Sequence, residues 1–214
     1  MKANFAQIKS LRLVPMVVID NADHADTFGE VLAAGGLPVA EITFRTPAAE
    51  AAIRAIARRG DVLVGAGTIL TIEQADRAID AGAQFLVAPG TNPKVVEHVL
   101  KRGLSMVPGV ATPSEIELAM SLGVDVLKFF PAETMGGVGA LKAFAGPYPD
   151  VQFMPTGGIT PELLPSYLRL PSVVACGGSW LAPRELLAAG RFDSIAALVE
   201  QAKKQLAEPA DIGT

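Results

Sequence analysis

The chain has 214 residues, half of them hydrophobic, and 18 basic against 22 acidic side chains give it a net charge of −4. This size and composition are typical of a single well-packed globular domain spanning residues 1–214. The acidic balance argues against a nucleic-acid partner, and the sequence contains no apolar run of membrane-spanning length.

Short apolar runs recur along the chain about every twenty to twenty-five residues, and helical patterns separate them. The eight runs are Leu13 to Ile19, Val39 to Phe44, Val62 to Gly65, Phe85 to Ala88, Ser105 to Val107, Val124 to Phe129, Val151 to Pro155 and Val173 to Cys176. Their near-continuous apolar character indicates parallel strands that are covered on both faces. Eight strand–helix units predict an α/β fold, a (β/α)8 TIM barrel, with a doubly wound open sheet as the alternative.

The segments between the runs carry helix signals, and residues 1–12 are predicted to form an extra N-terminal helix that closes the bottom of the barrel. Cap residues precede proline at Thr46-Pro47, Asn92-Pro93, Thr112-Pro113 and Thr160-Pro161, and capping boxes span Thr71–Gln74 and Thr112–Glu115. Left-handed C-caps are expected at Gly36, Gly60, Gly82, Gly103 and Gly123. The last helix is predicted over Asp193 to Leu206, followed by a frayed tail over residues 208–214.

Lys128 lies inside the apolar strand VLKFF, between Leu127 and Phe129. An unpaired ammonium buried in a core costs several kcal/mol, or the group loses its proton. A neutral lysine amine is a nucleophile that attacks a carbonyl to give a Schiff base. The alternative is a lysine near a sheet edge whose ammonium reaches solvent.

Glu41 is the second charged residue within an apolar strand. The period of two along a strand places Glu41, Thr43 and Arg45 on one face. A structural ion pair between Glu41 and Arg45 is one interpretation. Together with Lys128, the second interpretation is a Schiff-base site, in which a carboxylate moves protons and a cation holds an acidic substrate.

Two glycine pairs follow the last two predicted strands, at Gly157-Gly158 and at Gly177-Gly178, which Ser179 extends. Barrels often bind phosphate between these two loops, where glycine leaves backbone N–H groups open to an anion and a serine hydroxyl donates as well. Glycine pairs also form simple tight turns. Because both loops carry the pair, we predict a phosphate site there.

The remaining metal-binding and redox side chains are few. His24 and His98 lie in separate helical patterns without a second ligand three or four residues away, so both are expected at the surface and no metal or other cofactor is predicted. The single cysteine, Cys176, excludes an internal disulfide and is predicted to be a small core residue. A lone thiol and the absence of a signal-peptide apolar segment at the N-terminus fit a cytoplasmic protein.

Six motifs occur in a characteristic order and spacing: EITFRT at residue 41, VGAGT at 64, APG at 88, VLKFFPAE at 126, PTGGIT at 155 and GGSWL at 177. Over about residues 10–200 this pattern resembles the family of 2-keto-3-deoxy-6-phosphogluconate (KDPG) and 2-keto-4-hydroxyglutarate (KHG) aldolases. The resemblance implies a metal-free class I aldolase of the Entner–Doudoroff pathway on a trimeric (β/α)8 barrel. Such an enzyme cleaves KDPG to pyruvate and glyceraldehyde 3-phosphate, and many members also cleave KHG to pyruvate and glyoxylate.

The resemblance also implies a role for each residue that matches a motif. Lys128 corresponds to the Schiff-base lysine and Glu41 to the general acid and base. The remaining correspondences are Arg45 and Thr68 with the carboxylate contacts, Pro89 and Phe130 with the walls around the imine, Thr156 with a residue near the sugar hydroxyls, and Gly157, Gly158, Gly178 and Ser179 with the phosphate site.

Two other classes of protein remain open on the sequence. One is a phosphate-binding barrel epimerase or isomerase, which needs no lysine nucleophile. The other is a non-catalytic protein that binds a phosphorylated metabolite, for which Lys128 and Glu41 are dispensable.

Overall fold

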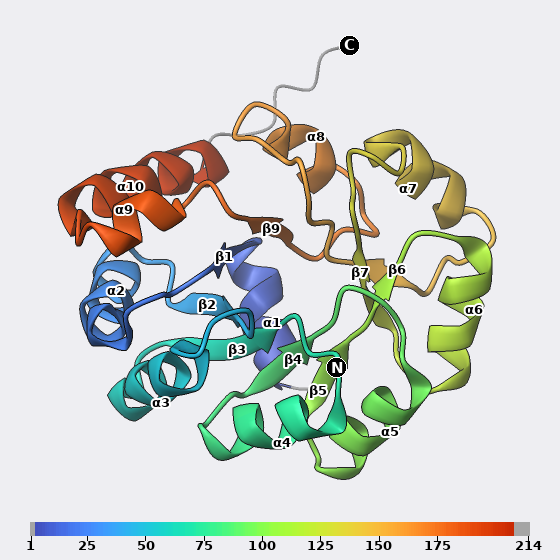
Figure 1. Ribbon diagram of the computed structural model, residues 1–214. Helices are drawn as coiled ribbons and strands as arrows, with labels where there is room; N and C mark the ends of the chain where they lie inside the picture. Colours follow the sequence, from blue (N-terminus) through green and yellow to red (C-terminus); the bar gives the residue numbers. More distant parts are fainter. Residues whose placement is uncertain (1–2, 208–214) are drawn as a thin grey trace.

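The computed structural model describes residues 3–207, with side chains described from Phe5 onward, and shows an α/β fold built on curled parallel sheets (Figure 1). The larger sheet has six strands in the order β5-β4-β3-β2-β1-β9. These strands are β1 (Leu13–Val17), β2 (Val39–Thr43), β3 (Leu63–Gly67), β4 (Phe85–Val87), β5 (Ser105–Val107) and β9 (Cys176–Gly178). The steady strand order, with the last strand beside the first, contradicts the doubly wound alternative, in which the order reverses at β1.

A second, three-stranded parallel sheet has the order β6-β7-β8 and contains β6 (Gly109–Val110), β7 (Val126–Phe129) and β8 (Gln152–Phe153). The fifth predicted run is β5, and only Pro108 separates it from β6, so the chain passes directly from the larger sheet into the smaller one. On the other side, isolated parallel bridges join Phe153 to Val173 and Thr156 to Gly177. All eight predicted runs therefore contain strand residues. The two sheets are linked on one side by the continuous chain through β5 and β6, and on the other side by isolated bridges.

Helices surround the strands as an outer layer, and α1 (Ala3–Leu11) lies near the centre of the view in Figure 1. The outer helices are α2 (Ala25–Ala34), α3 (Ala49–Arg59), α4 (Ile72–Asp80), α5 (Pro93–Lys101), α6 (Pro113–Ser121), α7 (Gly137–Ala145), α8 (Leu164–Leu168), α9 (Arg184–Ala188) and α10 (Phe192–Ala207), with a short 3-10 helix at Ala22–His24 before α2. The last helix agrees with its prediction within one residue at each end. The predicted frayed tail, residues 208–214, lies outside the described residues.

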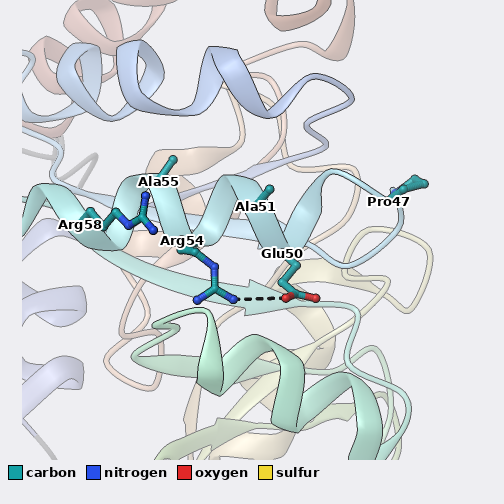
Figure 2. Close-up of a pocket in the computed structure, with 6 residues that line it drawn as sticks. All are labelled: Pro47, Glu50, Ala51, Arg54, Ala55 and Arg58. Carbon is teal, nitrogen blue, oxygen red and sulfur yellow. Dashed lines mark hydrogen bonds and ion pairs between the residues drawn. The ribbon is translucent and has the colours of Figure 1, made fainter.

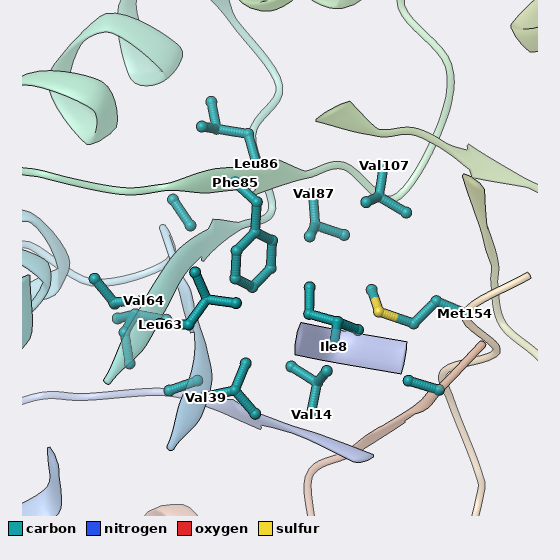
Figure 3. Close-up of a cluster of buried hydrophobic side chains, with 14 of the residues drawn as sticks. Ile8, Val14, Val39, Leu63, Val64, Phe85, Leu86, Val87, Val107 and Met154 are labelled. Carbon is teal, nitrogen blue, oxygen red and sulfur yellow. The ribbon is translucent and has the colours of Figure 1, made fainter. Parts of the chain in front are cut away.

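The N-terminal helix covers the amino ends of the strands, as the sequence predicts for residues 1–12. Figure 3 shows Ile8 of α1 among side chains from the surrounding strands, including Val14 and Phe85, and beside Met154, which directly follows β8. Ile8 is only 1% exposed. Because this end of the strands is closed by packed apolar side chains, polar chemistry is left to the carboxyl ends.

The helix caps follow the sequence signals in part. Asn92 and Thr112 cap α5 and α6, Thr112 within a complete capping box, and the five predicted C-cap glycines all have positive φ. The Thr71 side chain caps α4, but the Gln74 side chain accepts from Leu70 N rather than from Thr71 N.

Two predicted helix starts are wrong. The Thr46 hydroxyl donates to Ile19 O, so it is engaged away from the helix, and α3 begins only at Ala49. After Thr160-Pro161 the chain turns until α8 begins at Leu164. A helix from Pro161 would bring the ring of Pro165 against the carbonyl of Pro161, four residues earlier, which a regular helix does not accommodate.

Candidate active site

The two charged residues of the apolar strands meet near the carboxyl ends of the strands. Lys128 Nζ lies 3.3 Å from Glu41 Oε1, and the side chains are 4% and 0% exposed. Lys128 belongs to β7, the middle strand of its sheet, so the alternative of an edge lysine that reaches solvent is wrong. Glu41 pairs with this lysine, and no ion pair joins it to Arg45 among the described residues, so the structural Glu41–Arg45 pair is wrong too.

One oxygen of this buried carboxylate remains available. Glu41 Oε2 has no hydrogen-bond partner among the described residues. A buried polar atom without a partner is destabilising, and such atoms are characteristic of functional sites that await a ligand. Glu41 therefore presents one oxygen to the lysine and a second, unused acceptor.

The neighbouring strand leaves room for Glu41 because it carries a glycine. A Cβ atom at Gly67 on β3 would overlap Glu41 Oε1, so no larger residue fits there without moving the carboxylate. We did not single out Gly67 from the sequence, although a glycine inside a strand is the usual signal of such a close approach.

Two side chains approach the lysine amine besides Glu41, and Pro89 lies beside the neighbouring strand. The Phe130 ring centroid is 5.3 Å from Nζ, within the range of a cation–π contact, and Met16 Sδ is 4.0 Å away. Pro89 follows β4, and a Cβ atom added at Gly109 would overlap the Pro89 carbonyl oxygen. Gly109 is the residue of β6 that pairs with Lys128 of β7. Phe130 thus lies at the amine, and Pro89 lies beside the strand position that pairs with Lys128. Met16 was missed, because only the pairing of β1 with β2 brings it beside Glu41.

Arg45 and Thr68 follow the ends of β2 and β3. Arg45 is exposed, and its Nε donates to Thr43 Oγ1 at 3.3 Å, while the Thr43 hydroxyl donates to Val17 O. Thr68 has a φ of 60°, a conformation that a β-branched residue adopts only at a cost of about 1–3 kcal/mol. Strain of this kind is concentrated at binding sites, and the role of Thr68 in carboxylate binding stays a prediction.

The two predicted phosphate loops lie side by side. The parallel bridge between Thr156 and Gly177 joins the end of the β8 segment to β9. Gly157 and Gly158 have φ of 105° and 80°, which only glycine adopts readily. Gly178 is buried in β9, and Ser179 directly after it is exposed.

Thr156 lies beneath these loops with its side chain fully buried. Its Oγ1 has no hydrogen-bond partner among the described residues, and a Cβ atom at Gly177 would overlap it. The hydroxyl is a donor and an acceptor without a protein partner, as expected for a group that meets substrate.

The histidines and the cysteine lie elsewhere and are engaged. His24 Nδ1 contacts Leu187 O at 2.7 Å, and His98 Nε2 lies 2.9 Å from Asp76 Oδ1, so both rings are half-buried rather than at the open surface. No cluster of three or more metal-ligating side chains occurs among the described residues. Burial raises the pKa of the Cys176 thiol to about 12, which leaves it an unreactive core residue.

A surface hollow of about 350 Å³ lies along α3, lined by Pro47, Glu50, Ala51, Arg54, Ala55 and Arg58 (Figure 2). Arg54 and Glu50 form an ion pair of 3.2 Å within it, and Arg77 of α4 lies 2.9 Å from the other oxygen of Glu50. The hydrogen bond from Arg77 lowers the pKa of the Glu50 carboxyl. None of the predicted site residues lines this hollow, which is a solvated ion-pair surface between helices.

Comparisons with known proteins identify the family of this chain. The family model for KDPG and KHG aldolases matches residues 5–198. The chain belongs to the KDPG and KHG aldolase family. The 2-dehydro-3-deoxy-phosphogluconate aldolase of Treponema pallidum is 46% identical over 198 residues, which cover 92% of this chain and 94% of that protein. The KHG/KDPG aldolase of Escherichia coli is 44% identical over 191 residues, 89% of this chain and 90% of that protein.

Solved structures of the KDPG and KHG aldolase family have the same fold. The KDPG aldolase of Legionella pneumophila superposes with a TM-score of 0.90 at 36% identity, over 94% of this chain and 98% of that one. That structure holds pyruvate captured at low pH as a covalent carbinolamine intermediate. The family predicted from the six motifs is therefore confirmed, whereas the roles of individual residues remain predictions. Among the described residues, no helix is long and apolar enough to cross a membrane.

Proposed function

We propose that this protein is a class I aldolase that cleaves KDPG to pyruvate and glyceraldehyde 3-phosphate, and that it also cleaves KHG to pyruvate and glyoxylate. The observation that carries the proposal is the buried Lys128 amine, 3.3 Å from the Glu41 carboxylate. The carbinolamine in the Legionella relative supports the same chemistry. No metal is needed, because the imine itself acts as the electron sink.

Lys128 acts as the nucleophile. Glu41 Oε1 accepts the proton that the ammonium must lose, and the neutral amine adds to the C2 carbonyl carbon to give a carbinolamine. Glu41 returns this proton to the C2 oxygen, which leaves as water, so the Glu41 carboxylate is restored and an iminium ion forms, stabilised by the face of the Phe130 ring.

Glu41 then moves the second proton. Its carboxylate removes the proton of the C4 hydroxyl, the C3–C4 bond breaks, and the electron pair enters the iminium to leave an enamine. Glyceraldehyde 3-phosphate departs with the new aldehyde. The proton held by Glu41 is returned to C3, and water hydrolyses the iminium to release pyruvate and restore the Lys128 amine.

The surrounding residues orient the substrate. Arg45 and Thr68 hold the C1 carboxylate, Pro89 and Phe130 flank the imine, and the buried Thr156 hydroxyl meets a sugar hydroxyl. The backbone N–H groups of the turns at Gly157, Gly158 and Gly178, together with the Ser179 hydroxyl, bind the phosphate.

We further infer a single (β/α)8 barrel domain. The shared segment of β5 and β6 and the two bridges beside β8 support closure of the strands into one ring. By family resemblance we propose a cytoplasmic homotrimer in the Entner–Doudoroff pathway, whose partners are KDPG, pyruvate and glyceraldehyde 3-phosphate.

Borohydride reduction in the presence of pyruvate tests the activity class. We expect a stable adduct with the mass of one reduced pyruvyl group, and peptide mapping should assign it to Lys128. An epimerase or isomerase, or a non-catalytic phosphate-binding protein, gives no adduct because neither uses an amine nucleophile. An adduct on another lysine would refute the assignment of Lys128.

Replacing Ser179 by alanine tests the phosphate site. Loss of a hydroxyl donor to a charged acceptor should lower kcat/KM for KDPG about ten- to a hundred-fold, and kcat/KM for KHG should stay near the wild-type value because KHG has no phosphate. Ser121→Ala, which removes an exposed serine hydroxyl at the end of α6, is the matched control. An equal loss with both substrates would show instead that Ser179 serves packing.

A further inference from the structure

A buried tyrosine and a carboxylate are hydrogen-bonded beside the Gly157–Gly158 turn. Tyr167 of α8 is 0% exposed, and its hydroxyl donates to Glu133 Oε1. Glu133 lies in the segment after β7, the strand that carries Lys128. The bond therefore connects the segment behind the lysine to the helix behind the predicted phosphate loop.

The backbone around Glu133 is hydrogen-bonded to the same turn. Ala132 N donates to Thr156 O at 2.9 Å, and Glu133 N donates to Gly157 O at 3.1 Å. A Cβ atom added at Gly158 would lie 2.8 Å from Glu133 Cβ. The first carbon of the Glu133 side chain therefore packs directly against the turn. A negative charge is thus placed beside a turn that we propose binds a negatively charged group.

The start of α7 confines the Glu133 carboxylate and its hydrogen bond to Tyr167. A Cβ atom at Gly137 would lie 2.9 Å from Glu133 Oε1 and 3.0 Å from the Tyr167 hydroxyl, so the start of α7 packs against the hydrogen-bonded pair. Burial, and then the hydrogen bond to Glu133, raise the pKa of Tyr167, so the phenol remains a proton donor at physiological pH.

We propose that Tyr167 is a positioning residue that holds the Glu133 carboxylate away from the phosphate of the substrate. This inference rests on the proposed function, in particular on phosphate binding at the Gly157–Gly158 turn. Like charges repel each other, and because Glu133 is exposed the repulsion acts partly through solvent and is strongest at low ionic strength. Without the Tyr167 hydroxyl, the carboxylate is free to rotate toward the turn and to oppose binding of phosphate there.

The test uses the phosphorylated substrate and a reaction that needs no phosphate. At low ionic strength, where charge is least screened, Tyr167→Phe should raise KM for KDPG about tenfold with little change in kcat. Proton exchange at the methyl group of pyruvate should stay at the wild-type rate. Tyr148→Phe is the matched control, since it removes the 3.1 Å hydrogen bond from the other tyrosine to a glutamate, Glu117, on the outer helices.

Neutralising Glu133 distinguishes charge from packing. The double variant Glu133→Gln with Tyr167→Phe should return KM for KDPG to within about twofold of wild type, because an amide does not repel phosphate. Glu133→Gln alone should show a wild-type KM and keeps the proposal testable if Tyr167→Phe does not fold.

Three results would overturn the proposal: an unchanged KM in Tyr167→Phe, a double variant that stays impaired, or a raised KM in Glu133→Gln alone. Wild-type protein without pyruvate exchange or KDPG cleavage would instead refute the proposed function itself.

Discussion

Lys128→Arg should abolish KDPG cleavage while the protein still folds. Arginine cannot lose its proton to become a nucleophile, so the covalent step is lost. Its guanidinium still pairs with the buried Glu41 carboxylate, so the charge balance of the interior is kept. We expect kcat below about one percent of wild type, since loss of covalent catalysis removes several factors of ten.

The measurement is a coupled assay for pyruvate release, with circular dichroism to check folding. Lys101→Arg is the matched control, because the Lys101 side chain is 79% exposed and its ammonium pairs with Glu97 on the same helix. Cleavage by folded Lys128→Arg protein at more than about one percent of the wild-type rate would show that another group is the nucleophile.

Glu41→Gln should separate imine formation from proton transfer. Glutamine keeps the shape of the side chain and can hydrogen-bond Lys128, but it does not carry a proton. We expect the borohydride-trapped pyruvate adduct to form still, and exchange of the pyruvate methyl protons with deuterium to slow about a hundred- to ten-thousand-fold.

Deuterium incorporation is followed by proton NMR, with the amount of trapped adduct measured in parallel. Glu50→Gln, in the ion-pair hollow on α3, is the control for loss of a carboxylate outside the candidate site. Wild-type exchange in Glu41→Gln would reduce Glu41 to a structural partner of Lys128.

Local patterns in the sequence were sufficient for the framework of the fold. Eight apolar runs all contain strands, and five glycines before strands all have the positive φ that their position requires. Both features can be read from neighbouring residues. A strand buried on both faces requires apolar side chains, and a left-handed backbone conformation favours glycine. The motifs around Glu41 and Lys128 were equally local, which is why the family was recognisable.

Helix starts were less certain because a cap residue has more than one possible partner. Thr46 and Thr112 both precede proline, yet only Thr112 caps its helix. The Thr46 hydroxyl instead meets a carbonyl, Ile19 O, that is 27 residues away in sequence. A competing acceptor of this kind is invisible to a local pattern.

The geometry of the candidate site was decided by tertiary structure. Glu41 and Lys128 are 87 residues apart, and the sequence alone left open whether Glu41 pairs with Arg45 or with the lysine. Strand order and register settle the choice, since they bring the inner faces of β2 and β7 together where Gly67 leaves space. The Tyr167–Glu133 bond, the Met16 contact and the partners of the two histidines arise in the same way. Residue type and spacing along the chain specify which side chains are buried, whereas which buried groups meet depends on how distant strands align.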